Sequence, residues 1–388
     1  MRLALFLVLL AVLVTLLVVS HVYLYRRLLR DPQVPNQVAK LGRSLLWFMG
    51  VGTLIGTPAV RYFDVPGKPY VGFIWLIWAG LVALCVSILV VGDVIRAIYS
   101  RVLAGDTFDS GRRRFFARGL AGAATATAVT TATSGVALAL SDPTLESVQV
   151  PIDGLPDALD GFRIVQLSDT HFGPTLRHEF ADHLVERVNA LRPDLVALTG
   201  DLVDGSVSDL GPIVQKLASI ESRHGIFFVT GNHEYYSGAG PWVEALDSWG
   251  IRVLRNECAV VEHDGAELDI LGVDDWRASR FMKDHGYDFK RANQGRDRKR
   301  PSVLLSHQPK AIHDAADGEI DLVLSGHTHG GQIWPGKYIV KLVQPYVRGL
   351  HRHSERTWIY VHCGTGFWGP PIRVGVPAEV ALIELKQA

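Results

Sequence analysis

The sequence predicts an α/β domain with two packed β-sheets, preceded by an α-helical membrane region. From Phe162 onward, apolar strand-like runs alternate with helical patterns, which is typical of a parallel sheet. After Gly250 the apolar runs are shorter and follow one another closely, so we expect a second sheet packed on the first. Long apolar segments come earlier in the chain. The prediction is therefore a membrane region, residues 1–140, followed by an α/β domain, residues 141–388.

Two segments of the membrane region, residues 3–24 and 70–91, are apolar runs long enough to cross a bilayer. Residues 45–60 form a shorter run that contains glycines, either a span or a re-entrant segment, and residues 119–140 are rich in Ala, Thr and Gly. We therefore predict three or four transmembrane helices. The first run is expected to be a retained anchor, because Arg26 follows it where a signal peptide would have a small-residue cleavage site.

The charge distribution predicts the orientation of this multi-pass protein. The formal net charge is zero, which argues against nucleic acid as a partner. Arginines crowd the first and third loops, whereas the second offers only Arg61 and Lys68, so loops one and three are expected in the cytoplasm. Four spans then place the α/β domain on the outer face, which we expect, and three leave it in the cytoplasm. Arg112-Arg113 before residues 119–140 also resembles a twin-arginine export signal, although a simple anchor is favoured.

The α/β domain begins at a polar connector that contains Pro143 and Pro151. Strands are predicted at Ile164, Leu195 and Ile226, with helices at residues 179–191 and 210–222 between them, and this βαβαβ order requires a parallel sheet. Later short strands are predicted at Ile251, Ala259, Leu268, Ser302, Leu322, Trp358 and Val380. The basic run at residues 290–300 is expected to be a surface loop.

Acidic and imidazole residues follow several of these strands. Asp169 and His171 are one residue apart after the first strand, so both side chains can face the same side and bind one ion. Asp201 follows the next strand, and its single carboxylate can bridge two cations. Each residue alone would more often be a helix cap or a turn residue. Ligands at the carboxyl ends of strands, however, converge on one crevice.

Three further segments supply the other donors. In Gly231-Asn232-His233-Glu234, the amide of Asn232 offers a neutral oxygen to a cation, and His233 is left for other work. In the Gly-His-Thr-His-Gly-Gly segment, His327 and His329 are flanked by glycines that let the backbone turn around an ion. His307 follows a strand in the same way as the acidic residues.

In this order the motifs resemble those of the calcineurin-like metallophosphoesterase superfamily, over residues 164–373, and the layout resembles its membrane-associated bacterial branch. The resemblance implies two packed mixed β-sheets flanked by helices, the metallophosphoesterase four-layer sandwich, and two divalent ions. It implies one ion at Asp169, His171, Asp201 and His329 and another at Asp201, Asn232, His307 and His327. His233 would face the substrate as a catalytic residue. Asp204 could orient an imidazole, although a turn role is favoured.

These ligands define the expected chemistry. Two cations that share a bridging hydroxide can attack a phosphate ester in line, and oxygen and imidazole donors without thiolate suit Mn, Fe or Zn. His233 could protonate the leaving alkoxide. A phosphodiester is the preferred substrate class and a phosphomonoester the alternative. A non-catalytic receptor with a structural metal is disfavoured by the complete ligand set, and a transporter by the lack of buried charged residues in the membrane runs.

The substrate and the partners are less determined by the sequence. A membrane-tethered enzyme suggests a lipid-linked or cell-envelope substrate. The basic run at residues 290–300 could contact anionic head groups or simply be solvated. Tyr235, Tyr236, Phe367, Trp368 and Arg373 could form a rim around the site or pack in the core. Cys258 and Cys363 are either buried thiols or a bridge, and the oligomeric state is open.

Overall fold

The computed structural model describes residues 2–62, 68–103 and 110–388. The chain forms two compact units. The first comprises Met1–Ala137 with Gly369–Ile372, and the second comprises Leu138–Trp368 with Arg373–Ala388.

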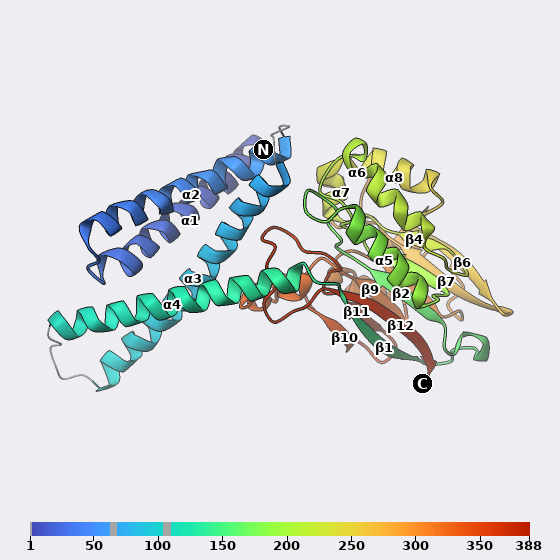
Figure 1. The fold of residues 1–388 in the computed structure, drawn as a ribbon. Coiled ribbons are helices and arrows are strands. Elements are labelled where there is room, and N and C mark those ends of the chain that lie inside the picture. Colours follow the sequence, from blue (N-terminus) through green and yellow to red (C-terminus); the bar gives the residue numbers. More distant parts are fainter. Residues whose placement is uncertain (1, 63–67, 104–109) are drawn as a thin grey trace. The chain divides into compact units, whose positions relative to one another are not determined.

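The first unit is helical. Its elements are α1 (Arg2–Leu24), a π-helical turn (Tyr25–Arg30), α2 (Asn36–Tyr62), α3 (Lys68–Leu103) and α4 (Ser110–Ala139), blue to green in Figure 1. Among the residues that the structure describes, three helical segments are long and apolar enough to cross a membrane, Leu10–Arg30, Asn36–Ala59 and Tyr70–Ile98. The fourth predicted run is helical within α4, but α4 is not among these segments. The number of spans and the orientation stay predictions.

Ionisable side chains of the helical unit pair with one another. Trp78 Nε1 donates to His21 Nε2 at 3.1 Å, and His21 Nδ1 donates to the carbonyl of Leu17 at 2.8 Å. Asp93 accepts from Arg27 and from the hydroxyl of Tyr23. His21 is thus a buried ionisable residue in the first apolar run, which the sequence analysis did not single out. Since both ring nitrogens have partners, this neutral imidazole packs as a hydrogen-bonded link between two helices.

Two six-stranded sheets build the second unit, and both are mixed. The first has the order β1-β12-β2-β3-β4-β5, and the second β10-β11-β9-β8-β7-β6. The bounds of the first are β1 (Thr144–Ile152), β12 (Glu379–Gln387), β2 (Arg163–Leu167), β3 (Leu195–Leu198), β4 (Ile226–Phe228) and β5 (Arg252–Val253). Those of the second are β10 (Gly349–Arg352), β11 (Trp358–Val361), β9 (Leu322–Ser325), β8 (Ser302–Leu305), β7 (Ala266–Gly272) and β6 (Glu257–His263).

Helices flank both sheets. Figure 1 shows α5 (His178–Ala190), α6 (Val207–Val214) and α8 (Ala239–Ser248) over the outer face of the first sheet. The short helices α9 (Phe289–Ala292) and α10 (Ile312–Asp317) pack on the second. The other short elements are α7 (Asn232–Ser237), α11 (Gly336–Val340) and 3₁₀ turns at Asp157–Leu159, Gln215–Ser219, Ala278–Arg280, Pro309–Ala311 and His329–Gly331.

Three apolar layers result from strand alternation. In β2, Ile164 faces the core between the sheets, whereas Val165 and Leu167 face the helices, as period-two side chains must. Apolar side chains of β7 and β8 complete the central layer, and those of α9 and α10 the outer layer of the second sheet. The prediction of two packed mixed sheets flanked by helices, preceded in the sequence by a helical region, is confirmed.

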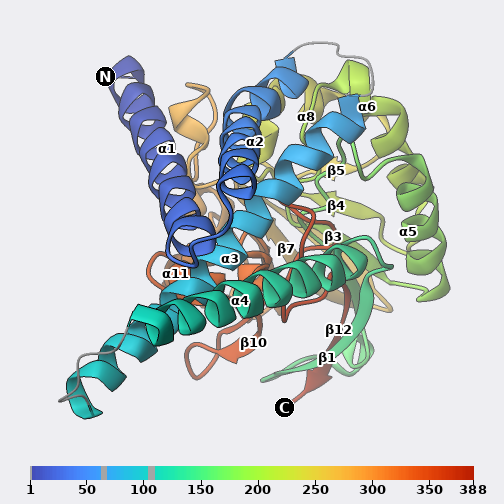
Figure 2. The ribbon, with the colours of Figure 1, turned by 60° about the vertical axis from the view of Figure 1, so that its left-hand side comes forward.

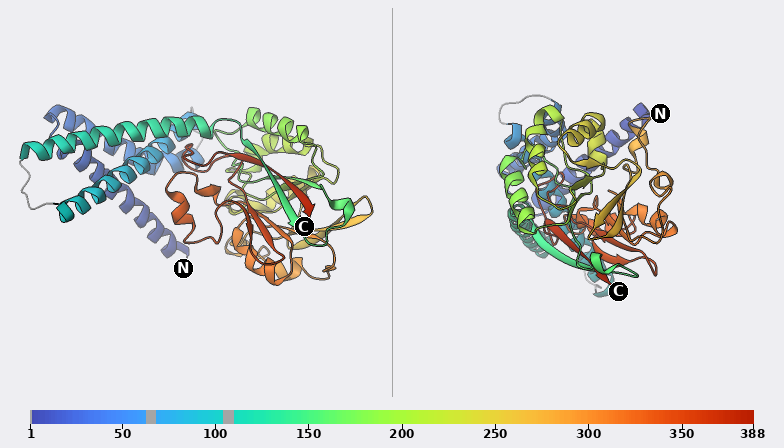
Figure 3. Two further views of the ribbon diagram at one scale, coloured as in Figure 1. Left: turned by 90° about the horizontal axis from the view of Figure 1, so that it is seen from below. Right: turned by 90° about the vertical axis from the view of Figure 1, so that its right-hand side faces the viewer.

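Several elements differ from the sequence-based expectation. The polar connector is in fact β1, an edge strand that runs parallel to β12 along the first sheet (Figure 3). An edge strand has one backbone edge without a partner and so tolerates Pro151. The first four side chains of β1 are exposed, which explains its weak apolar signal. The strands predicted at Ile251 and Val380 both belong to the first sheet rather than to the second. The former is β5, parallel to β4, and the latter is β12, antiparallel to β2. β10 was not predicted, and Cys258 and Cys363 are free thiols rather than a bridge.

Candidate metal centre

The donor residues follow strands of both sheets. Asp169, Asp201 and Asn232 come just after β2, β3 and β4, and His307 and His327 just after β8 and β9. Left-handed backbone is uncommon for residues other than glycine and is often found at functional sites. It occurs at five of these donors: Asp169 (φ 53°), His171 (47°), Asp201 (54°), His327 (70°) and His329 (48°).

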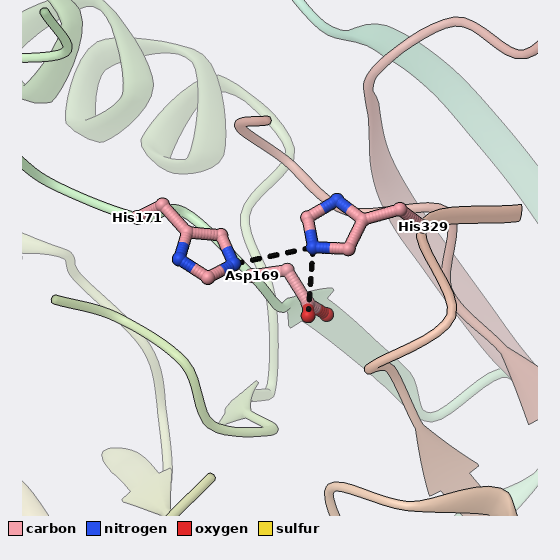
Figure 4. Close-up of side chains that lie close together, drawn as sticks. All are labelled: Asp169, His171 and His329. Atoms are coloured by element: carbon pink, nitrogen blue, oxygen red, sulfur yellow. Dashed lines mark hydrogen bonds and ion pairs between the residues drawn. The ribbon is translucent and has the colours of Figure 1, made fainter. Parts of the chain in front are cut away.

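A first group of donors consists of Asp169, His171 and His329, whose ligand atoms all lie within 4.8 Å of one another. Figure 4 shows the three side chains converging from two different parts of the chain. The Nε2 atoms of His171 and His329 are 3.1 Å apart, and His329 Nε2 is 3.3 Å from Asp169 Oδ1. Two imidazole nitrogens and a carboxylate oxygen at this spacing can share one cation.

A second group consists of Asp201, His307 and His327, again within 4.8 Å. His307 Nε2 lies 3.1 Å from both Asp201 Oδ2 and His327 Nδ1. His307 Nδ1 donates to the carbonyl of Thr199 at 2.8 Å, which leaves Nε2 as the nitrogen that can bind a metal. Asp201 Oδ2 is also 4.0 Å from His171 Nε2, so this carboxylate joins the two groups.

The surroundings of the Asn232 side chain indicate whether a cation fits the site. It is the first residue of α7 and is 7% exposed. Its Oδ1 atom is buried and accepts no hydrogen bond from any residue that the structure describes. An orphaned buried carbonyl oxygen is costly unless something binds it. Together with the carboxylates and imidazoles around it, this oxygen fits a divalent cation.

The electrostatics favour the metal-binding form of His327, His329 and Asp201. They favour the protonated form of His171 and His307, where burial is outweighed by neighbouring carboxylates that raise the pKa values. Burial lowers the pKa of His327 to about 3 and that of His329 to about 4, so both imidazoles are neutral, the form that binds metals. Burial alone would raise the pKa of Asp201, but the adjacent His307 and His233 outweigh it and lower that pKa. Burial disfavours the His171 cation, yet Asp204 and Asp201 raise its pKa to about 9.

Glu234 supports the centre from behind. Its carboxylate accepts the backbone N–H groups of Gly231, Leu202 and Asp201 at 2.7, 2.7 and 2.9 Å. Burial, followed by the charge of Asp201, raises the pKa of Glu234 to about 7. The sequence analysis assigned no role to this residue, although it stands in the same motif as Asn232.

Tight turns bring the donors together. A Cβ atom at Gly231 would overlap Asp201 Oδ1, and one at Gly326 would overlap Ser168 Oγ and Asp169 Oδ2. Ser168 Oγ donates to Asp169 Oδ2 at 2.6 Å. Only glycine leaves room for these close approaches, which explains why Gly231 precedes Asn232 and Gly326 precedes His327.

His233 lies beside the first group without joining it. Its Nδ1 donates to Asp204 Oδ1 at 2.5 Å, and its ring meets that of His171 edge to face at 4.6 Å. Asp204 Oδ2 is 3.2 Å from His171 Nδ1. These three residues also satisfy the spacing of a metal group. Since His171 Nε2 faces His329, however, we interpret Asp204 as the carboxylate that orients both imidazoles, rather than the turn residue that the sequence favoured.

Two aromatic side chains border His233. The ring of Tyr236 lies 5.1 Å from the His233 ring and that of Trp368 5.8 Å, and both side chains are exposed. They fit the expected rim.

The other rim candidates are packed in the interior instead. Tyr235 is buried and contacts Thr230 and His285 through its hydroxyl, and Phe367 packs with Leu176. Arg373 is 1% exposed, and its guanidinium donates to carbonyl groups of residues 363–377.

The basic run at residues 290–300 is partly neutralised. Arg300 pairs with Glu267 at 2.7 Å and Arg298 with Glu319 at 3.2 Å. Arg296 lies 3.9 Å from Asp269, with both side chains buried. Because these arginines have acidic partners, the run is not a free cationic surface, and its first residues belong to α9.

Comparison with known proteins places this α/β metal centre in a family. A family model for calcineurin-like phosphoesterases matches residues 162–331. A metallophosphoesterase of Helicobacter pylori is 40% identical over 247 residues, which cover 63% of this chain and 65% of that protein. A transmembrane protein with metallophosphoesterase domain from Danio rerio is 40% identical over 262 residues, 66% of this chain and 60% of that protein. A metallophosphoesterase of Aquifex aeolicus is 33% identical over 243 residues, which cover 62% of this chain and 91% of that protein.

The fold and the site thus define a metal-binding α/β protein of the phosphoesterase class. More particularly, the chain belongs to the calcineurin-like metallophosphoesterase family, since it covers nearly all of the Aquifex relative. The predicted superfamily is confirmed. The chain spans less than two thirds of the Helicobacter and Danio relatives' own length.

Proposed function

We propose that this protein hydrolyses phosphate esters with two divalent metal ions, and that a phosphodiester is its preferred substrate. The observation that carries the proposal is the pair of three-residue groups joined by Asp201, in which every side chain except the partly exposed His327 is buried. One ion would be held by Asp169, His171, Asp201 and His329, and the other by Asp201, Asn232, His307 and His327. Their oxygen and nitrogen donors suit Mn, Fe or Zn.

Bound ions in such a site would neutralise phosphoryl oxygens and lower the pKa of a water nucleophile to near neutrality. The chain's own contribution is to hold the substrate and move a proton. Asp204 accepts from His233 Nδ1 and fixes the orientation of the ring, so that Nε2 would deliver a proton to the departing alkoxide. Trp368 and Tyr236, beside this ring, would exclude water from the leaving group.

The replacement Asp201→Asn in the purified full chain tests this function. Since only this carboxylate lies within 4.0 Å of an imidazole in each group of described ligands, we expect the variant to lose turnover and both bound metals. The parent should hydrolyse bis(p-nitrophenyl) phosphate with added Mn. A variant that keeps two metals and substantial turnover would contradict the two-ion site. Parent activity on p-nitrophenyl phosphate alone would favour the phosphomonoesterase alternative.

The proposal extends to location and substrate. A membrane region at residues 1–140 would tether the catalytic domain, residues 141–388, to the cell membrane, and a lipid-linked or cell-envelope phosphodiester suits such an enzyme. The three apolar helical segments support this tether. The domain would lie on the outer face if α4 crosses the membrane as a fourth span, so that alkaline phosphatase fused after Ala388 should be active and GFP dark. Fluorescent GFP with protease protection in intact cells would place it in the cytoplasm.

A further inference from the structure

A loop that leaves the metal centre exposes a cluster of large apolar side chains. The loop contains α11, labelled in Figure 2, in which no side chain is buried. Leu342 is 82% exposed, Ile339 67% and Val343 61%. Trp334 and Tyr338 are exposed beside them. Neighbouring exposed apolar residues of this kind mark interaction surfaces rather than ordinary solvent-facing positions.

Both ends of this loop are anchored. At its start, the Gln332 amide donates to the carbonyl of Trp368 at 2.9 Å and accepts from the Trp368 N–H at 3.1 Å. At its end, Gln344 is buried, and Thr328 Oγ1 donates to the carbonyl of Val347 at 2.6 Å. Because hydrogen bonds fix both ends of the loop, we interpret the exposure of its apolar side chains as a property of the folded structure.

The charged side chains of the loop and its flanking residues are all basic. Residues 322–354 contain no Asp or Glu, whereas Lys337 and Lys341 alternate with the exposed apolar residues and Arg348 follows. Lys337 Nζ lies 5.0 Å from the centre of the Tyr338 ring. Aromatic rings and lysines bordering an apolar tip match a bilayer surface, where the rings sit at head-group level and the lysines meet anionic lipid. A protein partner would not require this arrangement.

We propose that residues 334–343 form a lipid-docking loop that inserts its apolar side chains into the surface of an anionic bilayer. The chain carries its own apolar helical segments, so a bilayer is always within reach of the domain. Because the loop starts directly after the turn that carries His327 and His329, docking would bring the entrance of the metal centre to the level of the head groups. The inference concerns binding only and holds whether or not the protein hydrolyses phosphodiesters.

Depth measurement on the full chain tests the loop. A nitroxide is attached to Leu342→Cys in protein reconstituted into nanodiscs of phosphatidylcholine with phosphatidylglycerol. The matched control is Val260→Cys on β6, which is also an exposed apolar position, at 47%. Cys85 and Cys363 are buried but Cys258 on β6 is partly exposed, so both labels are placed in a Cys258→Ser chain, which without a further cysteine gives the background labelling. We expect the Leu342 label to be accessible to oxygen and shielded from a water-soluble nickel complex, and the Val260 label to be accessible to nickel.

Two results would overturn the proposal. Nickel access at Leu342 equal to that at Val260 would show that the loop stays in water. A label that is immobile and shielded from both reagents, in detergent as well as in nanodiscs, would show that protein covers the loop, either this chain's own helices or a second copy. Since the readout is the position of the label, neither result depends on catalytic activity.

A second variant tests the role of charge. With Lys337→Glu and Lys341→Glu in the labelled protein, we expect the Leu342 label to become accessible to nickel in anionic nanodiscs. Lys337→Arg with Lys341→Arg should leave it shielded. If the glutamate pair leaves the label as deep as in the parent, the anionic part of the proposal is wrong.

Discussion

Glu234→Gln should loosen the metal centre without touching a ligand side chain. The carboxylate of Glu234 accepts three buried backbone N–H groups, two on Oε2 and one on Oε1. A glutamine oxygen in the place of Oε2 can keep the N–H groups of Gly231 and Asp201, but its NH₂ then faces the N–H of Leu202, donor against donor. The variant therefore orphans one buried donor and weakens two charge-assisted bonds.

The expected loss of stability can be worked from these contacts. An orphaned buried donor costs about 1–3 kcal/mol, and each bond that loses its charged acceptor weakens by about 1 kcal/mol. Burial and Asp201 oppose the charge of Glu234, whose pKa is raised to about 7, so removing it returns part of this loss. We expect a net loss of about 2 kcal/mol, or about 4–8 °C in the unfolding temperature of a domain of this size. Metal affinity should fall about 10- to 100-fold, because Glu234 fixes the backbone of Asp201.

Thermal unfolding and chelator competition for Mn, both on the full chain, measure the two quantities. Glu244→Gln, on the exposed side of α8, is the matched control and should change neither. If Glu234→Gln unfolds at the same temperature as this control and binds Mn equally well, the carboxylate does not organise the centre, and the reasoning from its three hydrogen bonds is refuted.

Three further replacements probe other parts of the site. His233→Ala should keep both metals and lose about 10²- to 10⁴-fold in rate on an alkyl diester but less on an aryl ester, whose leaving group needs no proton; equal losses would point to positioning instead. Gly326→Ala should lose bound metal because its methyl group overlaps Asp169, whereas Gly240→Ala, whose methyl group would lie 3.6 Å from Met282, should bind metal normally; full metal loading of Gly326→Ala would disprove the steric argument. Arg373→Met should lower the free energy of unfolding by about 3 kcal/mol, since the guanidinium of Arg373 satisfies several buried carbonyls. Arg298→Met, which removes an exposed ion pair, should lower it by less than about 1 kcal/mol. Similar losses for the two variants in a denaturation series would contradict this reasoning.

The sequence alone determined the local features of this protein. Apolar runs before Asp169, Asp201 and His327 mark buried strands, because a strand covered on both faces must be apolar throughout. The residue types that follow them determine what chemistry is possible, and glycines show where the backbone turns sharply. These signals act over a few residues, so they can be read from the order of the chain.

The tertiary structure decided the features that depend on contacts between segments far apart in the sequence. The place of β12 between β1 and β2, the joint contact of Asp204 with His171 and His233, and the role of Glu234 each need segments tens of residues apart to meet. A carboxylate that caps a turn and one that orients an imidazole look the same in sequence. The pairing of β2, β3 and β4 in the first sheet distinguishes them, because it brings Asp204 to His171 and His233. The packing of the two sheets then brings the ends of β2 and β3 to those of β8 and β9, and so sets which of the remaining buried polar groups must satisfy one another.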